Sequence, residues 1–271
     1  ATTELMASST LKGFSLISGL PIEKYSPDQA QLIFYGIGTH LGVGVSQSHL
    51  GDYIGDVIDR QDAKDLRPYH NGGEFIMHRD PVDAVGLLCI HQAKSGGESR
   101  IISAATVHNI FAAEAPELLA PLYEGFHYWR LPADMGDTDQ RSPYKIPVFK
   151  IPEGGSFSSH FIPGPIERAL ADEKVTPDQP QAKAIALLKE LLWTRPELYY
   201  DMTLKPGDMQ FVNNRLLLHG RTDYLEHDDI SQRRHLLRLW LQMPSWGLPA
   251  LNQTFYTNID RAGGGVAAAH K

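Results

Sequence analysis

Apolar residues recur at the spacing of a helix in three stretches of the chain. Residues 26–29 and 176–179 both read Ser or Thr, then Pro, Asp and Gln, which predicts a helix start with a capping hydroxyl and Pro at the first helical position. A third helical stretch spans about 104–123 and is broken near Pro116. Downstream of the two caps, apolar side chains form one face of each predicted helix: Ala30, Ile33, Phe34, Ile37 and Leu41, then Ala184, Leu187, Leu188, Leu191 and Leu192.

Most of the remaining chain reads as short strands separated by turns, such as the Pro-Gly turn at 205–208. Many short strands with a few covering helices predict a mainly β fold, a double-sheet jelly roll. We expect one domain over 1–271, with a core of about 13–243 and a loose tail over about 258–271. The predicted strands are 13–17, 43–47, 53–58, 84–92, 99–102, 123–130, 147–151, 158–162, 199–204, 209–213, 216–219 and 234–242.

Composition narrows the class of protein. The chain has 271 residues, 42% of them hydrophobic and 21% charged, which is typical of a globular domain. A net charge of −7 without a basic block argues against general nucleic-acid binding. No apolar run reaches about 18 residues, so no membrane span is expected. A single cysteine, Cys89, cannot form a disulfide within the chain, which favours a reducing, cytoplasmic location. The start at Ala1, without a signal pattern, indicates a trimmed N-terminus.

Two His-x-Asp patterns are candidate metal sites. With 12 His and 32 acidic residues in 271, chance alone gives roughly 1.4 His-x-acid matches. The pattern at His227 and Asp229 lies in a charged run that reads as a solvated loop. The pattern at His78 and Asp80 borders apolar strands, where residues two apart project from one face. With the remote His219, it offers two imidazoles and one carboxylate, the facial set that non-haem Fe(II) oxygenases use.

The last predicted strand carries basic residues on an apolar background. Alternation puts Arg234, Leu236, Arg238 and Trp240 on one face. A buried guanidinium needs an anionic partner, and it holds a carboxylate through two parallel hydrogen bonds. The strand therefore predicts either an anchor for a dicarboxylate co-substrate or structural arginines paired with core acids.

The order of these motifs resembles the taurine dioxygenase-like (TauD/TfdA) family of Fe(II)/2-oxoglutarate-dependent oxygenases, which have a jelly-roll core. The resemblance runs from about Gly13 to Met243. The motifs that carry it are His78-x-Asp80, Gly96-Gly97-Glu98-Ser99, Asn213-x-Arg215-x-x-x-His219-Gly220-Arg221 and Arg234-x-x-x-Arg238.

The resemblance implies site residues and a reaction. His78, Asp80 and His219 would bind iron, and Arg234 would pair with the distal carboxylate of 2-oxoglutarate. Arg238 would be a second basic contact, and Ser99 falls where the family commonly has a Thr hydroxyl that touches the same carboxylate. With O2, such an enzyme hydroxylates, desaturates or cyclises a substrate and releases succinate and CO2.

Several features leave alternatives open. Arg79 departs from the smaller residue that is usual between the two ligands, although on an extended backbone it would point away from them. A zinc hydrolase with a similar triad is one alternative. A non-catalytic jelly-roll binding protein is another.

The expected substrate is small and carries a carboxylate or another anion. Arg215 and Arg221 alternate onto the predicted strand face of His219 and could meet it, although both could instead pair with carboxylates or assist the co-substrate. His70, Asn71 and Glu74 precede the metal motif and border the open side of such a site. The sequence predicts neither the substrate's identity nor an oligomeric state.

Overall fold

The computed structural model describes residues 13–48, 50–59, 74–129, 140–151 and 157–246. Among the predicted features, His70, Asn71 and the tail over 258–271 lie outside these ranges. None of the described helices combines the length and apolar composition that crossing a bilayer requires.

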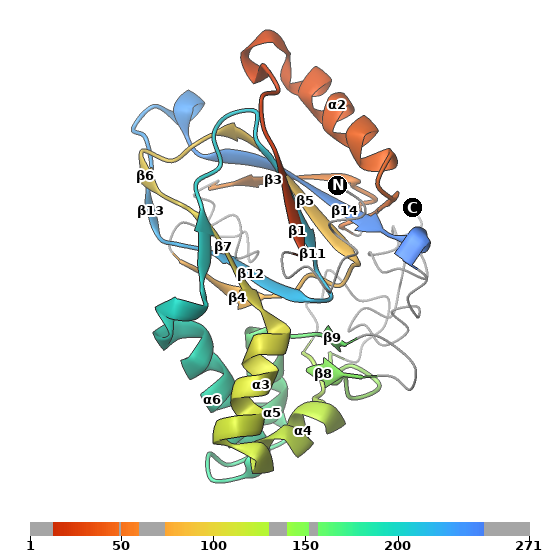
Figure 1. Cartoon of the computed structure of the whole chain (residues 1–271), viewed down its shortest axis with the longest axis vertical. Coiled ribbons are helices and arrows are strands. Elements are labelled where there is room, and N and C mark those ends of the chain that lie inside the picture. The colour runs from red at the N-terminus through yellow and green to blue at the C-terminus, as the bar shows by residue number, and fades with distance from the viewer. Residues whose placement is uncertain (1–12, 49, 60–73, 130–139, 152–156, 247–271) are drawn as a thin grey trace.

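Two antiparallel sheets face each other and form the predicted jelly-roll core (Figure 1). In the larger sheet β14 pairs with β5, β3 and β2, and β11 lies between β5 and β1. The larger sheet comprises β1 (Phe14–Ile17), β2 (Val43–Val45), β3 (Ile54–Ile58), β5 (Ala84–His91), β11 (Met209–Asn213) and β14 (His235–Gln242). The smaller sheet has the order β10 (Tyr200–Met202), β7 (Ser99–Ser103), β12 (Leu217–Arg221) and β4 (Phe75–His78). Two short ribbons pair β6 (Ser95–Gly96) with β13 (Tyr224–Leu225) and β8 (Phe149–Lys150) with β9 (Ser158–Ser159).

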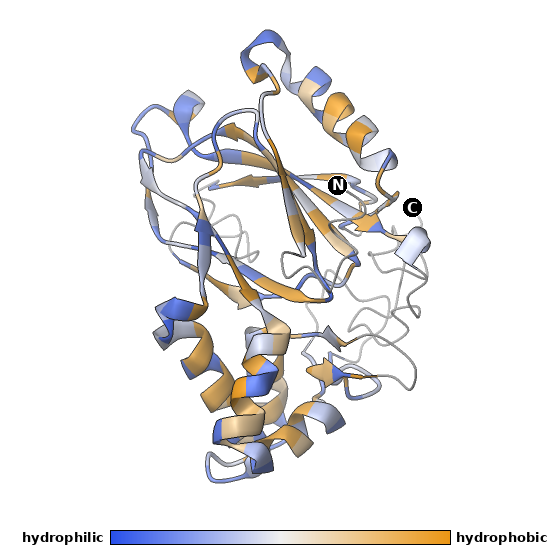
Figure 2. Ribbon diagram, in the orientation of Figure 1, coloured by the Kyte–Doolittle hydropathy of each residue, from blue (hydrophilic) through white to orange (hydrophobic). Residues whose placement is uncertain are grey.

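Helix α2 (Pro27–Thr39) covers the outer face of the larger sheet (Figure 1). The helix begins as predicted. The Ser26 hydroxyl accepts a hydrogen bond from the backbone N–H of Gln29 at 3.3 Å, and the side-chain oxygen of Gln29 accepts one from the backbone N–H of Ser26 at 2.9 Å. Its apolar face (Figure 2) buries Phe34 against Leu239 and neighbouring leucines of β14. The opposite face of β14 points between the sheets, so the strand is covered on both sides.

The other long helices form a separate group beyond the smaller sheet (Figure 1). They bury their apolar faces in one cluster that continues into the sheets. They are α3 (Ala104–Glu114), α4 (Leu119–Glu124), α5 (Pro163–Asp172) and α6 (Pro180–Thr194). The short 3-10 helices are η2 (Ile22–Lys24), η4 (Pro116–Leu118), η6 (Pro196–Leu198), η7 (Ile230–Gln232) and η8 (Pro244–Trp246).

Three predictions of local structure were wrong. The strand predicted over 123–130 is absent from its described part, because α4 ends at Gly125 (φ 85°) and only isolated bridges follow. The helix after Thr176 begins three residues later, since Pro180 lacks the N–H that a fourth helical residue donates and fits the first position instead. Helix α5 was missed because its Pro-Gly-Pro start reads as a turn, although proline is compatible with a first helical turn.

Candidate metal centre

Strand β12 brings together the two histidines that are far apart in sequence. Alternation turns Leu217, His219 and Arg221 toward the space between the sheets. The register pairs His219 with His78 of β4, so both rings project from one face with centroids 4.4 Å apart. Asp80 lies two residues after the end of β4 and is the third member of the group.

The three side chains form a compact set of possible ligands. One donor atom from each lies within 4.8 Å of the others. Asp80 Oδ1 is 3.6 Å from His78 Nε2, and Asp80 Oδ2 is 3.8 Å from His219 Nε2. Metal–ligand bonds of about 2.1 Å put neighbouring ligands about 3 Å apart, so small side-chain movements would suffice for a shared ion. No other such group occurs among the described residues, and His227 with Asp229 does not form one.

Hydrogen bonds orient two of these ligands. His78 Nδ1 lies 2.9 Å from the Ile76 carbonyl, which can only accept, so the proton is on Nδ1 and the lone pair of Nε2 faces Asp80. Trp240 Nε1 donates to Asp80 Oδ2 at 2.9 Å, and Arg238 Nη1 lies 3.5 Å from the same oxygen. Both donors come from the inward face of β14, where alternation had placed them.

The protonation states suit a metal ion. Burial by itself raises the pKa of Asp80, but the positive charge of the neighbouring Arg238 outweighs it, and the pKa falls well below its usual range. Burial, followed by the neighbouring His78, lowers the pKa of His219 to about 3. An ionised carboxylate and a neutral imidazole are the forms that bind metals. The donor set therefore fits Fe(II), which this class of site binds through two histidines and one carboxylate.

The segment before β12 contacts the turn that carries Asp80 and fixes its position. Asn214 Nδ2 donates to the carbonyls of Asp80 and Val82, the latter at 3.0 Å. Arg215 forms a buried ion pair with Asp83, with Nη2–Oδ1 at 2.6 Å. The expectation that Arg215 shares the face of His219 was wrong, because β12 begins only at Leu217. Arg215 holds the turn that carries Asp80, which we call the metal-site turn, and does not line the cavity beside the three candidate ligands.

That cavity, which we call the arginine pocket, has a volume of about 50 Å³. Arg234 is only 6% exposed, and its guanidinium makes no hydrogen bond or ion pair with any residue in the described part of the chain. It lies 5.5 Å from the Tyr224 ring, and Arg221 lies 4.5 Å from the same ring. Burial, followed by the charge of Arg221, lowers the pKa of Arg234 to about 10, so it remains a cation at neutral pH. The pocket is lined by Val57, Phe75, His78, Val85, Leu87, Ser99, His219, Gly220, Arg221, Arg234, Leu236 and Arg238.

Three further residues predicted to contact the co-substrate or the substrate bond to other side chains of the protein. Arg238 Nε donates to Gln47 Oε1 at 2.7 Å, a partner that no sequence motif indicated. The Ser99 hydroxyl lines the arginine pocket but donates to Gln210 Oε1 at 2.8 Å. Glu74 is exposed and lies 3.7 Å from Arg100 on the outer face of the smaller sheet. Its predicted substrate role therefore has no support from its position.

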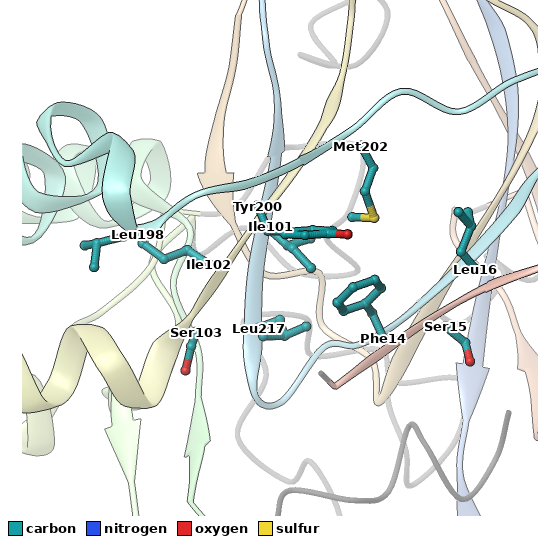
Figure 3. Close-up of a pocket in the computed structure, with 10 residues that line it drawn as sticks. All are labelled: Phe14, Ser15, Leu16, Ile101, Ile102, Ser103, Leu198, Tyr200, Met202 and Leu217. Atoms are coloured by element: carbon teal, nitrogen blue, oxygen red, sulfur yellow. The ribbon is translucent and has the colours of Figure 1, made fainter. Parts of the chain in front are cut away.

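A larger cavity of about 540 Å³ lies at the opposite edge of the two sheets, where β1 faces β10 (Figure 3). The rings of Phe14 and Tyr200 lie 5.3 Å apart there and join the two edges. Apart from Tyr200, none of its lining side chains is ionisable. Of these two cavities, only the arginine pocket is lined by charged side chains.

Comparison with known proteins agrees with this geometry. The model of the family "Taurine catabolism dioxygenase TauD, TfdA family" matches residues 3–240. FR-33289 synthase of Streptomyces rubellomurinus is 32% identical over 96% of this chain and 76% of its own length. A taurine hydroxylase-like protein of Stachybotrys chartarum is 25% identical over 88% of this chain and 63% of its own length.

Solved structures share the fold at low sequence identity. An asparagine oxygenase with Fe(II), hydroxyasparagine and succinate has a TM-score of 0.70 and 16% identity, covering 99% of this chain and 84% of its own. The non-haem iron oxygenase OrfP, with Fe and α-ketoglutaric acid, has a TM-score of 0.65 and 13% identity over 89% of this chain and 78% of its own. Neither the zinc hydrolase nor the non-catalytic alternative finds support among these proteins. The chain belongs to the TauD/TfdA family and is a non-haem iron dioxygenase that uses 2-oxoglutarate and O2.

Proposed function

We propose that His78, Asp80 and His219 hold Fe(II) and that Arg234 binds the distal carboxylate of 2-oxoglutarate. The observation that carries this proposal is the buried guanidinium of Arg234, which has no anionic partner among the described residues. A buried cation of this kind is stabilised by a bidentate carboxylate. The arginine pocket reaches from Arg234 to His78 and His219, so a dicarboxylate could contact both ends.

Each side chain has a definite task in this proposal. When bound, Fe(II) together with 2-oxoglutarate and O2 would supply the oxidising chemistry that acts on an unactivated C–H bond of the substrate. Trp240 and Arg238 hold one oxygen of Asp80, which leaves the other oriented toward His78. Tyr224 keeps the guanidinium groups of Arg221 and Arg234 beside its ring. The protein therefore contributes orientation and charge, and the buried pocket excludes water.

Arg221 is better suited to the co-substrate than to the substrate. It lines the same pocket as Arg234 and pairs in register with Ser99 of β7. Because the Ser99 hydroxyl is engaged by Gln210, we propose that Arg221 provides the second contact to the distal carboxylate. A substrate contact at Arg215 has no support from its position, and for Arg221 we adopt the alternative that it assists the co-substrate.

We propose a small molecule as substrate, with an amino acid as the first candidate. Support comes from the neighbours in fold, because the asparagine oxygenase holds hydroxyasparagine and OrfP holds hydroxylated arginine. With Asp80 as a carboxylate ligand, hydroxylation, desaturation or ring closure is favoured. We also propose the cytoplasm as its location, which the single buried Cys89 supports.

The test has two stages. Anaerobic Fe(II) and 2-oxoglutarate are added to the protein, and we expect a visible charge-transfer band that Arg234→Met weakens and Arg233→Met leaves unchanged. Succinate release is then measured with the common amino acids and with their amides. Absence of the band with the parent protein would contradict the metal and co-substrate assignment. Failure to stimulate succinate release by any amino acid would contradict only the substrate class.

A further inference from the structure

Arg79 stands between two of the proposed ligands, yet its side chain leaves the metal centre. It is only 2% exposed and is the largest of the fully buried side chains. Its Nη1 donates to the Ser159 carbonyl at 2.6 Å, and its backbone N–H donates to the Phe161 carbonyl at 2.8 Å. The residue therefore attaches the metal-site turn to the segment 158–161, far away in sequence.

The same guanidinium also contacts the backbone of the turn that follows Arg79 in the chain. Its Nη2 lies 3.4 Å from the carbonyl of Val82, which Asn214 also contacts. One planar group thus spans the turn that carries Asp80 and the strand β9. A guanidinium can do this because its donors are fixed in one plane.

Segment 158–161 is tied in turn to the chain that leads to His219. The Ser159 N–H donates to the Arg215 carbonyl at 2.9 Å, and Arg215 pairs with Asp83 of the metal-site turn. Contacts therefore run from Arg79 through Ser159 and Arg215 to Asp83, and the ring closes through Val82, the neighbour of Asp83, whose carbonyl Arg79 contacts. Ser159 lies between the two arms of chain that carry Asp80 and His219.

Arg79 has no carboxylate partner of its own among the residues that the structure describes. Asp83 is the acid that raises its pKa most, but that carboxylate is bonded to Arg215 and to the Met243 N–H. Burial lowers the pKa of Arg79 to about 9. An apolar side chain of similar length would fill this space without the desolvation of a charge. What the guanidinium adds is its bonds to the two carbonyls.

We propose that Arg79 is a positioning residue that couples the metal-site turn to segment 158–161, so that metal binding at one stabilises the other. This inference rests on the proposed metal site. Arg79 touches neither metal nor substrate and acts through the backbone of Asp80 and Ser159. It accounts for an arginine where smaller residues would satisfy the ligand spacing.

The test uses Co(II) alone as the probe, with the full chain and its Arg79→Met and Arg79→Lys variants. Metal affinity is measured by titration calorimetry, and amide hydrogen exchange at Ser159 and His160 is compared with and without Co(II). In the parent, we expect Co(II) to slow exchange at both amides. Arg79→Met should weaken Co(II) binding about 10–100-fold, the usual effect of losing a group that supports a metal ligand, and should abolish the slowing.

Arg79→Lys should lie between the two, because an ammonium keeps the charge and can reach one carbonyl but not hold both in one plane. Leu188→Ala is the control for general destabilisation, because Leu188 of α6 is fully buried in the hydrophobic core. It should lower the melting temperature without changing Co(II) affinity.

The possible outcomes separate the two proposals. A parent protein that binds no Co(II) would overturn the metal site itself. A parent that binds Co(II), with Arg79→Met showing the same affinity and the same slowing at Ser159, would overturn only the role of Arg79. If Arg79→Met does not fold, parent-like affinity and slowing in Arg79→Lys would overturn it equally.

Discussion

The arginine pocket and the larger cavity are lined by the same strand, β12, and yet only one of them is charged. Leu217 faces the larger cavity, while His219 and Arg221, two and four residues further along the same face, line the arginine pocket. A spacing of about 3.3 Å per residue means that the change occurs within about 7 Å. The difference shows how sharply a sandwich core can be divided between packing and chemistry.

The two regions also differ in what they require. Apolar walls such as those formed by Ile101 and Leu217 need no partner, and burying them is favourable. The buried guanidinium of Arg234, which has no ion pair among the described residues, needs an anion, and its burial is unfavourable until one binds. The small pocket that contains it is therefore the better candidate for a ligand site than a tenfold larger apolar one.

The largest expected effect comes from removing a proposed ligand. His219→Ala should weaken Fe(II) binding more than about 100-fold, because losing a ligand costs more than losing a supporting group. Leu217→Ala, on the same face of β12, should lower stability by about 2–5 kcal/mol and keep Fe(II) binding. Bound iron is measured per chain at a temperature where both variants are folded. Equal retention of iron by the two variants would remove the distinction between the cavities. His227→Ala should behave like the parent.

Arg234→Met tests the charge of the arginine pocket. Losing a buried charged pair with 2-oxoglutarate costs about 2–5 kcal/mol, roughly 30-fold or more in Kd. Arg233→Met is the matched control, since the Arg233 side chain bonds the His227 carbonyl outside the pocket. The measurement is the anaerobic 2-oxoglutarate titration in the presence of Fe(II). Small and equal effects at both positions would contradict the anchoring role.

Trp240→Phe keeps an aromatic, though smaller, ring in the core and removes the donor to Asp80. Hydrogen bonds to charged groups contribute about 1.5–3 kcal/mol, so we expect Fe(II) affinity to fall about tenfold or more. Trp246→Phe is the control, because Trp246 is buried but its Nε1 has no hydrogen-bond partner in the described structure. Iron titration compares the two variants. An equal loss in both would indicate that only packing matters.

The smallest effect is expected at the larger cavity. Tyr200→Ala removes the ring that contacts Phe14 across the two sheet edges and should lower the free energy of unfolding by about 1 kcal/mol. The Kd for 2-oxoglutarate should remain within about twofold of the parent. Denaturant unfolding and the same anaerobic titration provide both numbers. A marked loss of 2-oxoglutarate affinity would show that the larger cavity belongs to the site after all.

The sequence predicted what depends on local pattern. The capping box at Ser26, the interruption near Pro116 and the inward face of β14 follow from spacing alone, and the structure has all three. The grouping of His78 and Asp80 with His219 followed from motif order, and the structure brings them together. Their role as iron ligands, like the role of Arg234, stays a prediction.

What the sequence did not predict depends on where strands begin and on partners far apart in the chain. Arg215 was misplaced because two residues separate it from the start of β12, and alternation does not apply before a strand begins. Gln47 reaches Arg238 only through the pairing of β2 with β14, 191 positions away. The anchoring of Arg79 to Ser159 likewise needs the path of a loop that no periodicity encodes.

The position of β14 in the larger sheet has a consequence for synthesis of the chain. Among the described residues, strands β2 and β3 pair only with β14, and β5 pairs only with β11 and β14, so all three lack these neighbours until residues 209–242 exist. A nascent chain grows at about 5–20 residues per second, which leaves these strands unpaired for many seconds. Folding of the larger sheet is therefore expected only after β14 has been synthesised, and a chain truncated before β14 would lack Trp240 and Arg238, which hold Asp80.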